Sequence, residues 1–281
     1  MKFIKCLRYD FLYGILKNGW LWLCPIMLGG AVFFDGLNRI NKIYLFQQPK
    51  SPVTFGDIWF YAYGGMKPYH PSPENAFQFP VIWLVLYLSI AFILLNYPLR
   101  DFEGGGLQRL IRFQARYRWW VSKCAWNISC TMVLHLVFVC VLVILSIGQG
   151  IPITREIHLD LIKLLFELDI RTELIQRFTI PVSILLAPLL LSIFLNLFQM
   201  LLSLFVKPVF SFFTITSVLL SSTYLLDTAA IGNYGMVLRY SWVLPMGVSY
   251  PVGMVVSMIF IVLSVITGWI RCHFFDILSK E

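Results

Sequence analysis

Charged side chains are scarce in this chain of 281 residues. Asp, Glu, Lys and Arg together make up 13 % of it, whereas about 25 % is usual for a soluble globular domain. So few charges cannot cover a water-exposed surface, and hydrophobic residues account for 59 % of the chain. The composition therefore excludes an ordinary soluble protein and indicates a polytopic membrane protein.

The sequence also lacks the groups that catalysis or cofactor binding would need. The glycines at 104–106 are not followed by Lys-Ser or Lys-Thr, so the chain has no phosphate-binding loop for ATP. No CxxC or Cys/His spacing indicates a metal site. No two titratable groups pair within the apolar segments, which argues against an intramembrane enzyme. We expect no catalytic residue, no metal and no cofactor in this chain.

What the chain does contain is a series of long apolar segments. A membrane-spanning helix needs about 20 mostly apolar residues, and six segments meet that requirement: 18–37, 79–97, 124–148, 178–206, 208–226 and 252–270. Within their apolar cores, His135 is the one titratable side chain, and a single neutral histidine is too little to ligate a coupled ion. We predict an all-α fold, with residues 1–281 forming one domain of six transmembrane helices.

The basic residues indicate how this domain is oriented. Six spans place both termini on one side, and that side carries 13 of the 22 Lys and Arg residues but only five of the 14 acids. The whole net charge of +8 therefore lies on one face. By the positive-inside rule this face is cytoplasmic, which predicts a plasma-membrane protein with both termini inside. The six cysteines fall in spans or cytoplasmic segments, so no disulfide is expected.

The segments outside the spans carry patterns of their own. Residues 1–17 place apolar and charged side chains on opposite faces, as in a helix that lies in the membrane interface; a simple basic leader is the alternative. Thr54 and Asp57 form a capping-box pattern before the aromatic stretch 58–63. For this stretch we favour an aromatic belt at the headgroup layer over a surface that receives substrate.

Two further segments lie on the predicted outer side. Residues 154–177 have apolar residues at helical spacing, which predicts an amphipathic surface helix. Residues 227–251 are apolar but broken by glycine and proline. Irregular backbone at membrane depth must be buried in protein or line a cavity, so we expect short half-helices that dip into the outer leaflet.

The densest functional signal is the cytoplasmic loop 99–123. Its glycine triplet at 104–106 is followed by ten residues without a helix breaker, which predicts a hinge and then a short helix. Arg112 and Arg116 are four residues apart and would share one face of that helix. A basic stop-transfer loop above anionic lipid would explain the charges, but neither the glycines nor the helix.

With this loop and this layout, the chain resembles the type-2 ABC-exporter permeases, particularly the small six-span subunits of bacteriocin and antimicrobial-peptide export or immunity systems in Gram-positive bacteria. The resemblance covers the layout of the whole chain and is most specific at 106–112 and 118–123. It implies an N-terminal elbow helix, a re-entrant segment before the last span, and a coupling helix that docks on a separate ATPase. The residues implied for that docking are Gly106, Gln108, Arg109, Arg112, Phe113 and Arg116.

The expected function is thus that of a permease subunit of an ATP-driven transporter, which exports or expels an amphipathic peptide or a lipid-like substrate. ATP and Mg would be bound by two copies of the ATPase partner; a second permease, the same or related, and membrane lipid complete the partners, and no nucleic acid is expected. The candidate path residues are Asn127, His135, Asn196 and Gln199, although helix-packing hydrogen bonds account for such residues more often. A non-transporting membrane sensor or immunity protein and an ion-coupled secondary transporter are the open alternatives.

Overall fold

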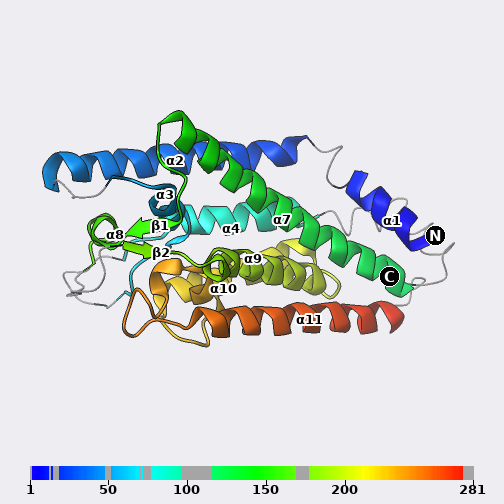
Figure 1. The fold of residues 1–281 in the computed structure, drawn as a ribbon. Helices are drawn as coiled ribbons and strands as arrows, with labels where there is room; N and C mark the ends of the chain where they lie inside the picture. Colours follow the sequence, from blue (N-terminus) through cyan, green and yellow to red (C-terminus); the bar gives the residue numbers. More distant parts are fainter. Residues whose placement is uncertain are drawn as a thin grey trace.

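The computed structural model of the protein describes residues 2–12, 14, 19–47, 52–69, 71, 77–96, 116–168 and 177–274. Over these residues the fold is mostly helical, as predicted (Figure 1). The α-helices are α1 Lys2–Phe11, α2 Trp20–Gln47, α3 Phe55–Tyr63, α4 Val81–Leu94, α7 Arg116–Gly148, α8 Leu159–Phe166, α9 Val182–Leu202, α10 Pro208–Tyr224 and α11 Tyr250–Phe274. Two 3₁₀ helices, η3 Ile231–Gly235 and η4 Val237–Arg239, precede α11.

Four of these helices are long and apolar enough to cross a membrane. The qualifying stretches are Trp22–Phe46 in α2, Tyr117–Gly148 in α7, Val182–Leu202 in α9 and Tyr250–His273 in α11. The apolar helices α4 and α10 are shorter; the 14 residues of α4 extend about 21 Å, against about 30 Å for the hydrocarbon core. The helices indicate a multi-pass membrane protein, and the count of six spans stays a prediction.

Several helices begin or end beyond the apolar segments that predicted them. The helix α2 continues to Gln47 rather than ending at 37. An ion pair at 3.1 Å joins Asp35, which precedes the predicted end, to Arg39, which follows it. The helix α7 begins at Arg116 rather than at 124. Neither extension, 38–47 in α2 or 116–123 in α7, contains glycine or proline. A helix therefore does not stop where its hydrophobicity stops.

The long helices lie side by side, and the two ends of the bundle differ (Figure 1). The helix α1 and the C-terminal end of α11 lie at one end, which we call the termini end. The helices α3 and α8, the small sheet and the turns before α11 lie at the opposite end. We call this second group the cap; it consists of residues 52–69, 151–168, 177–181 and 227–249. Helix α9 is the central helix, because it packs against α4, α7, α10, α11 and η3.

Two expectations for the cap need correction, and a third is refined. The surface helix predicted over 154–177 is instead a strand, β1 Glu156–His158, followed by α8, and β1 pairs antiparallel with β2 Arg177–Thr179. The aromatic stretch 58–63 does not face the headgroup layer: every residue of it is buried, because α2, α7 and β1 pack around α3. The half-helices expected over 227–251 are the 3₁₀ helices η3 and η4, and their backbone is enclosed by protein, as apolar surroundings require.

At the termini end, a buried ion pair joins α1 to α7. The Lys123 ammonium lies 2.6 Å from Oδ1 of Asp10, and neither side chain is exposed. The Ser122 hydroxyl donates to Oδ2 of the same carboxylate at 2.6 Å. The sequence pattern placed Asp10 on the polar face of an interfacial helix and Lys123 at the end of an exposed loop. The two side chains instead neutralise each other inside the protein.

Breaking this ion pair should destabilise the protein strongly, because the carboxylate would be left buried without its main counter-charge. For Lys123→Met we expect a loss of about 3–5 kcal/mol, measured as a lower midpoint for loss of monodisperse protein on heating in mild detergent. The double substitution Asp10→Asn with Lys123→Met should lose less than Lys123→Met alone. Lys207→Met, which removes an exposed lysine at the start of α10, is the matched control. Equal midpoints for Lys123→Met and Lys207→Met would contradict this account.

Candidate functional site

The cap is organised around the first turn of α3. Thr54 and Asp57 form the predicted capping box: the Asp57 amide donates to the Thr54 hydroxyl, and the Thr54 amide donates to the Asp57 carboxylate. The Thr54 hydroxyl also donates to the Glu156 carbonyl at 2.5 Å. Gly56 permits this close approach of α3 to β1, since a Cβ there would lie 2.2 Å from that carbonyl oxygen. The capping box therefore holds α3 against the strand as well as starting the helix.

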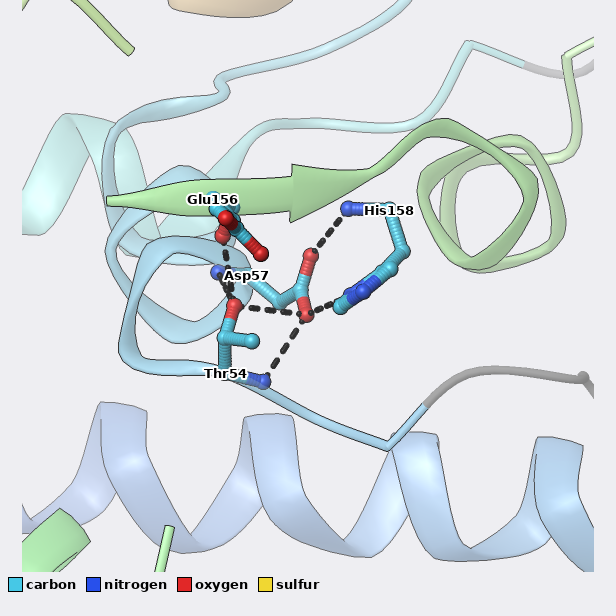
Figure 2. Close-up of polar contacts among 4 residues, drawn as sticks. All are labelled: Thr54, Asp57, Glu156 and His158. Atoms are coloured by element: carbon cyan, nitrogen blue, oxygen red, sulfur yellow. Dashed lines mark hydrogen bonds and ion pairs between the residues drawn. The ribbon is translucent and has the colours of Figure 1, made fainter. Parts of the chain in front are cut away.

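Asp57 also binds His158, although no local sequence pattern relates the two residues. Figure 2 shows both carboxylate oxygens directed at this residue: Oδ1 accepts from the His158 amide at 2.8 Å, and Oδ2 lies 2.9 Å from Nδ1 of its ring. Both side chains are buried. Since a carboxylate accepts hydrogen bonds, Nδ1 carries the proton. The pair joins α3 to β1 across 101 residues of sequence.

A second buried cation holds the turns before α11. Arg239 is fully buried, and its guanidinium donates only to carbonyl and amide oxygens. Three of these bonds go to Met66, Ser222 and Thr223, at 3.1, 2.6 and 2.7 Å. Carbonyls at the C-terminus of a helix such as α10 carry partial negative charge, so they stabilise the guanidinium without a carboxylate. Burial lowers the pKa of Arg239 to about 10, and the side chain is charged at neutral pH.

A cleft of about 470 Å³ lies between the cap and the helices α2 and α4. Its walls are the outer part of α2, the end of α3, the loop after α3, the start of α4 and the end of α8. The charged side chains that line it are Asp35, Arg39, Lys67 and Glu167. Aromatic side chains from several elements also line it: Tyr61, Tyr69, Phe79, Trp83 and Phe166. The cleft thus combines two charges of each sign with aromatic walls, as ligand-binding clefts commonly do.

The charges in the cleft form two partly exposed pairs. On one wall, Nε of Arg39 donates to Oδ2 of Asp35 at 3.1 Å, and the Tyr61 hydroxyl donates to the same oxygen. Burial, and secondly this hydrogen bond to Asp35, raise the pKa of Tyr61 well above its ordinary value, so its hydroxyl stays protonated. On the other wall, Nζ of Lys67 donates to the Glu167 carbonyl at 3.2 Å and lies 3.8 Å from its carboxylate.

None of the four predicted path residues lines this cleft. Asn127 donates to the Asn196 carbonyl at 3.4 Å, which joins α7 to α9. Gln199 donates to the Ala91 carbonyl of α4 at 3.0 Å, so it does not face the same neighbour as Asn196. Nδ1 of His135 lies 3.0 Å from the Tyr63 hydroxyl of α3. These residues are all buried between helices of one chain, where they hold the helices together.

Two of these contacts, those of Asn127 and His135, belong to a continuous feature of α7, which we call the polar row. It consists of four buried polar side chains spaced four residues apart: Lys123, Asn127, Thr131 and His135. Residues at this spacing lie on one face of a helix. The partners of the row lie on α1, α9 and α3 in turn, from the termini end to the cap.

The predicted ATPase-coupling residues Gly106, Gln108, Arg109, Arg112 and Phe113 lie outside the described residues. Arg116 is the first residue of α7. The last part of the predicted loop 99–123 is therefore helical and continuous with the helix that carries the polar row. Sequence reasoning missed the cleft residues; the spacing of Asp35 and Arg39 was a usable signal, but nothing local relates Lys67 to Glu167.

Comparison with known protein families finds one family that matches this chain. Residues 30–278 match the family described as protein of unknown function (DUF2705). The match includes most of the chain, with the cap, the cleft and the long helices, and the chain belongs to this family. No match is found among curated proteins.

Replacing Asp57 should loosen the cap without unfolding the bundle. An amide at this position has only one acceptor oxygen, whereas the carboxylate uses both. In Asp57→Asn, at least one buried N–H loses its acceptor, at a cost of about 1–3 kcal/mol. We expect faster amide hydrogen exchange over residues 54–63 and 156–158, measured by mass spectrometry. Asp160→Asn, at an exposed position in the first turn of α8, should leave exchange unchanged; equal effects of the two substitutions would contradict this account.

Proposed function

We propose that the chain is the membrane-spanning permease subunit of an ATP-driven ABC transporter, which exports or expels an amphipathic peptide or a lipid-like substrate. In this proposal a separate ATPase, present in two copies, binds ATP and Mg and docks on the loop 99–123. The observation that carries the proposal is the continuity of α7 between that loop and the cap. The chain itself would contribute no catalytic residue.

Helix α7 is suited to transmit a displacement along its length. It contains 33 residues, which at a rise of 1.5 Å per residue extend about 50 Å, more than the thickness of a bilayer core. Its first residue is Arg116, which belongs to the predicted docking surface. No proline or glycine interrupts it before Gly148. A force applied at the loop would therefore move the helix as one body.

The far half of α7 is attached to the wall of the cleft. His135 bonds to Tyr63, and Tyr63 stands two residues after Tyr61, which lines the cleft from the same short helix. The rings of His135 and Tyr63 also stack, with their centroids 6.0 Å apart. A shift of α7 would consequently displace α3 and alter the cleft. This connection supports a protein that converts an event at the termini end into a change at the cap.

The same contacts weigh against ion-coupled transport. A coupling ion needs a charged or titratable ligand that faces a water-accessible site. His135 is buried and hydrogen-bonded to Tyr63, and the buried charges Asp10 and Lys123 neutralise each other. Among the described residues of the long helices we find no other buried acid or lysine. ATP-driven movement of whole helices requires no such ligand.

The outward faces of the bundle would contact the remaining partners, which are membrane lipid and a second permease. Helix α11 exposes a row of apolar side chains: Val255, Met258, Val262 and Ile266. Helix α10 exposes Val209, Phe210 and Phe213. Such faces would contact lipid or a second permease, the same or related, because neither demands hydrogen bonds. A membrane sensor or immunity protein could share this architecture, and it would differ in having no ATPase partner.

Reversing charge on the predicted docking helix should release the ATPase. We expect the tagged chain, solubilised from its own membrane in mild detergent, to recover a P-loop ATPase in stoichiometric amount. Arg112→Glu with Arg116→Glu should lower that recovery at least tenfold, because these basic side chains share one predicted helix face. Recovery is measured by quantitative mass spectrometry, with membrane insertion checked by the yield of monodisperse protein.

The matched control is Lys207→Glu with Lys280→Glu, which makes the same charge change elsewhere on the predicted cytoplasmic side. It should retain the ATPase. Undiminished recovery with the arginine variant would refute the docking surface. Absence of any P-loop protein with the unaltered chain would refute the permease and favour the sensor.

A further inference from the structure

The cleft lies at the level where the apolar parts of two membrane helices end. In α2 the apolar run is interrupted by Asp35, the first charged residue of that helix, and Asp35 lines the cleft. The apolar segment that includes α4 begins at Phe79, and both Phe79 and the polar residue before it, Gln78, line the cleft. Both helices therefore place the cleft at the boundary between hydrocarbon and headgroups, where charged side chains first become tolerable.

The side of the cleft next to α4 is open towards the surrounding medium. Phe79 is 59 % exposed and Val81 is 62 % exposed, and both are apolar residues that face out of the bundle. At this depth they would lie against acyl chains. A ligand that enters here would keep its hydrocarbon part beside α4 while its polar part reaches the charged walls.

The charged walls of the cleft offer groups that could bind both an anion and a cation on a ligand. Arg39 uses its Nε for Asp35, and its two terminal nitrogens donate to none of the described residues. Such nitrogens suit a phosphate, and Lys67 faces the same cleft with a second ammonium. Glu167 holds its carboxylate only at 3.8 Å from Lys67 and is largely exposed, so it is free to accept from an ammonium on a ligand.

The balance of these charges selects among amphiphiles. Two cations and two carboxylates line the cleft, which gives a formal charge of zero. An anionic head would be attracted by Arg39 and Lys67 but repelled by Asp35 and Glu167. A head that carries both a phosphate and an ammonium can satisfy both sets at once. The volume of about 470 Å³ is in the range of sites for small molecules.

We propose that this cleft binds the zwitterionic headgroup of a membrane phospholipid of the ethanolamine type, with the phosphate towards Arg39 and Lys67 and the ammonium towards Asp35 and Glu167. Tyr61 also lines this cleft, and its hydroxyl donates to Asp35 and so holds that carboxylate in place. The binding site requires that the chain lie in a membrane, but it does not depend on an ATPase partner.

The test compares lipids that differ in the headgroup alone. The purified full-length chain in mild detergent is incubated with an equimolar mixture of dioleoyl phosphatidylethanolamine and dioleoyl phosphatidylglycerol, and retained lipid is identified by native mass spectrometry. We expect at least a fivefold excess of bound phosphatidylethanolamine. Asp35→Asn, Arg39→Met and Lys67→Met should each reduce this excess to twofold or less, since each removes one charge of the cleft.

Two matched controls share the chemistry of these substitutions but lie outside the cleft. Lys42→Met removes an exposed cation from the same helix as Arg39, and Asp160→Asn removes an exposed carboxylate from α8. Both should keep the fivefold excess. Thermal unfolding is recorded for each variant, and because Lys67→Met alters a different wall from Arg39→Met, loss of fold in one still leaves the other to decide.

Three results would overturn the proposal. The first is equal retention of the two lipids by the unaltered chain. The second is a preference that survives in folded Arg39→Met or Lys67→Met. The third is displacement of bound lipid by a soluble tripeptide with free termini at micromolar concentration, which would assign the cleft to a peptide. None of these results depends on whether an ATPase is recovered, so failure here is distinguishable from failure of the permease proposal.

Discussion

A polar group inside an apolar helix bundle must find its partner within the protein, because lipid offers no hydrogen bond. The polar row of α7 is the most extended instance of this constraint here: each member has a partner, while Oδ1 of Asn127 and Nε2 of His135 have none among the described residues. Its four members lie on one face of a single helix: Lys123, Asn127, Thr131 and His135. Their partners come from α1, α9 and α3, so one helix connects the termini end, the central helix and the cap.

The polar row fixes the relative positions of the helices that it joins. A hydrogen bond weakens steeply when its angle or distance departs from the optimum. The bond between His135 and Tyr63 therefore sets the height of α3 relative to α7. The ion pair of Lys123 with Asp10 sets the height of α1 in the same way.

Features that depend on residues close together in the sequence could be predicted, whereas contacts between distant residues could not. The apolar runs located the long helices, because a bilayer selects for hydrophobicity within each segment. The capping box of Thr54 and Asp57 was predictable because its partners are three residues apart. The pairing of Asp57 with His158 was not, since 101 residues separate them. The aromatic residues of α3 were misplaced for a related reason: their composition suits a headgroup layer and a buried core equally.

The predicted site residues show the same division. Asn127, His135, Asn196 and Gln199 were identifiable as polar residues in apolar segments, but only the fold shows that each one contacts a neighbouring helix. The coupling helix in the loop 99–123 is predicted from the local sequence pattern, and most of this loop lies outside the described residues. Its role in coupling therefore rests on the resemblance and on its continuity with α7.

The cap contains two kinds of polar contact, buried and partly exposed, which differ in how much they contribute to stability. Within the cap, the Asp57–His158 pair and the guanidinium of Arg239 are buried, so breaking them would leave unpaired polar groups away from water.

Around the rim of the cleft, the pairs Asp35–Arg39 and Lys67–Glu167 are partly exposed, and exposed ion pairs contribute little to stability, about 0–1 kcal/mol. A ligand could therefore exchange the rim contacts for its own charges at small cost, while the buried anchors keep α3 and β1 in place. Because α3 is also bonded to α7 through Tyr63, movement of α7 would act on the cleft through α3, which contributes Tyr61 to its wall.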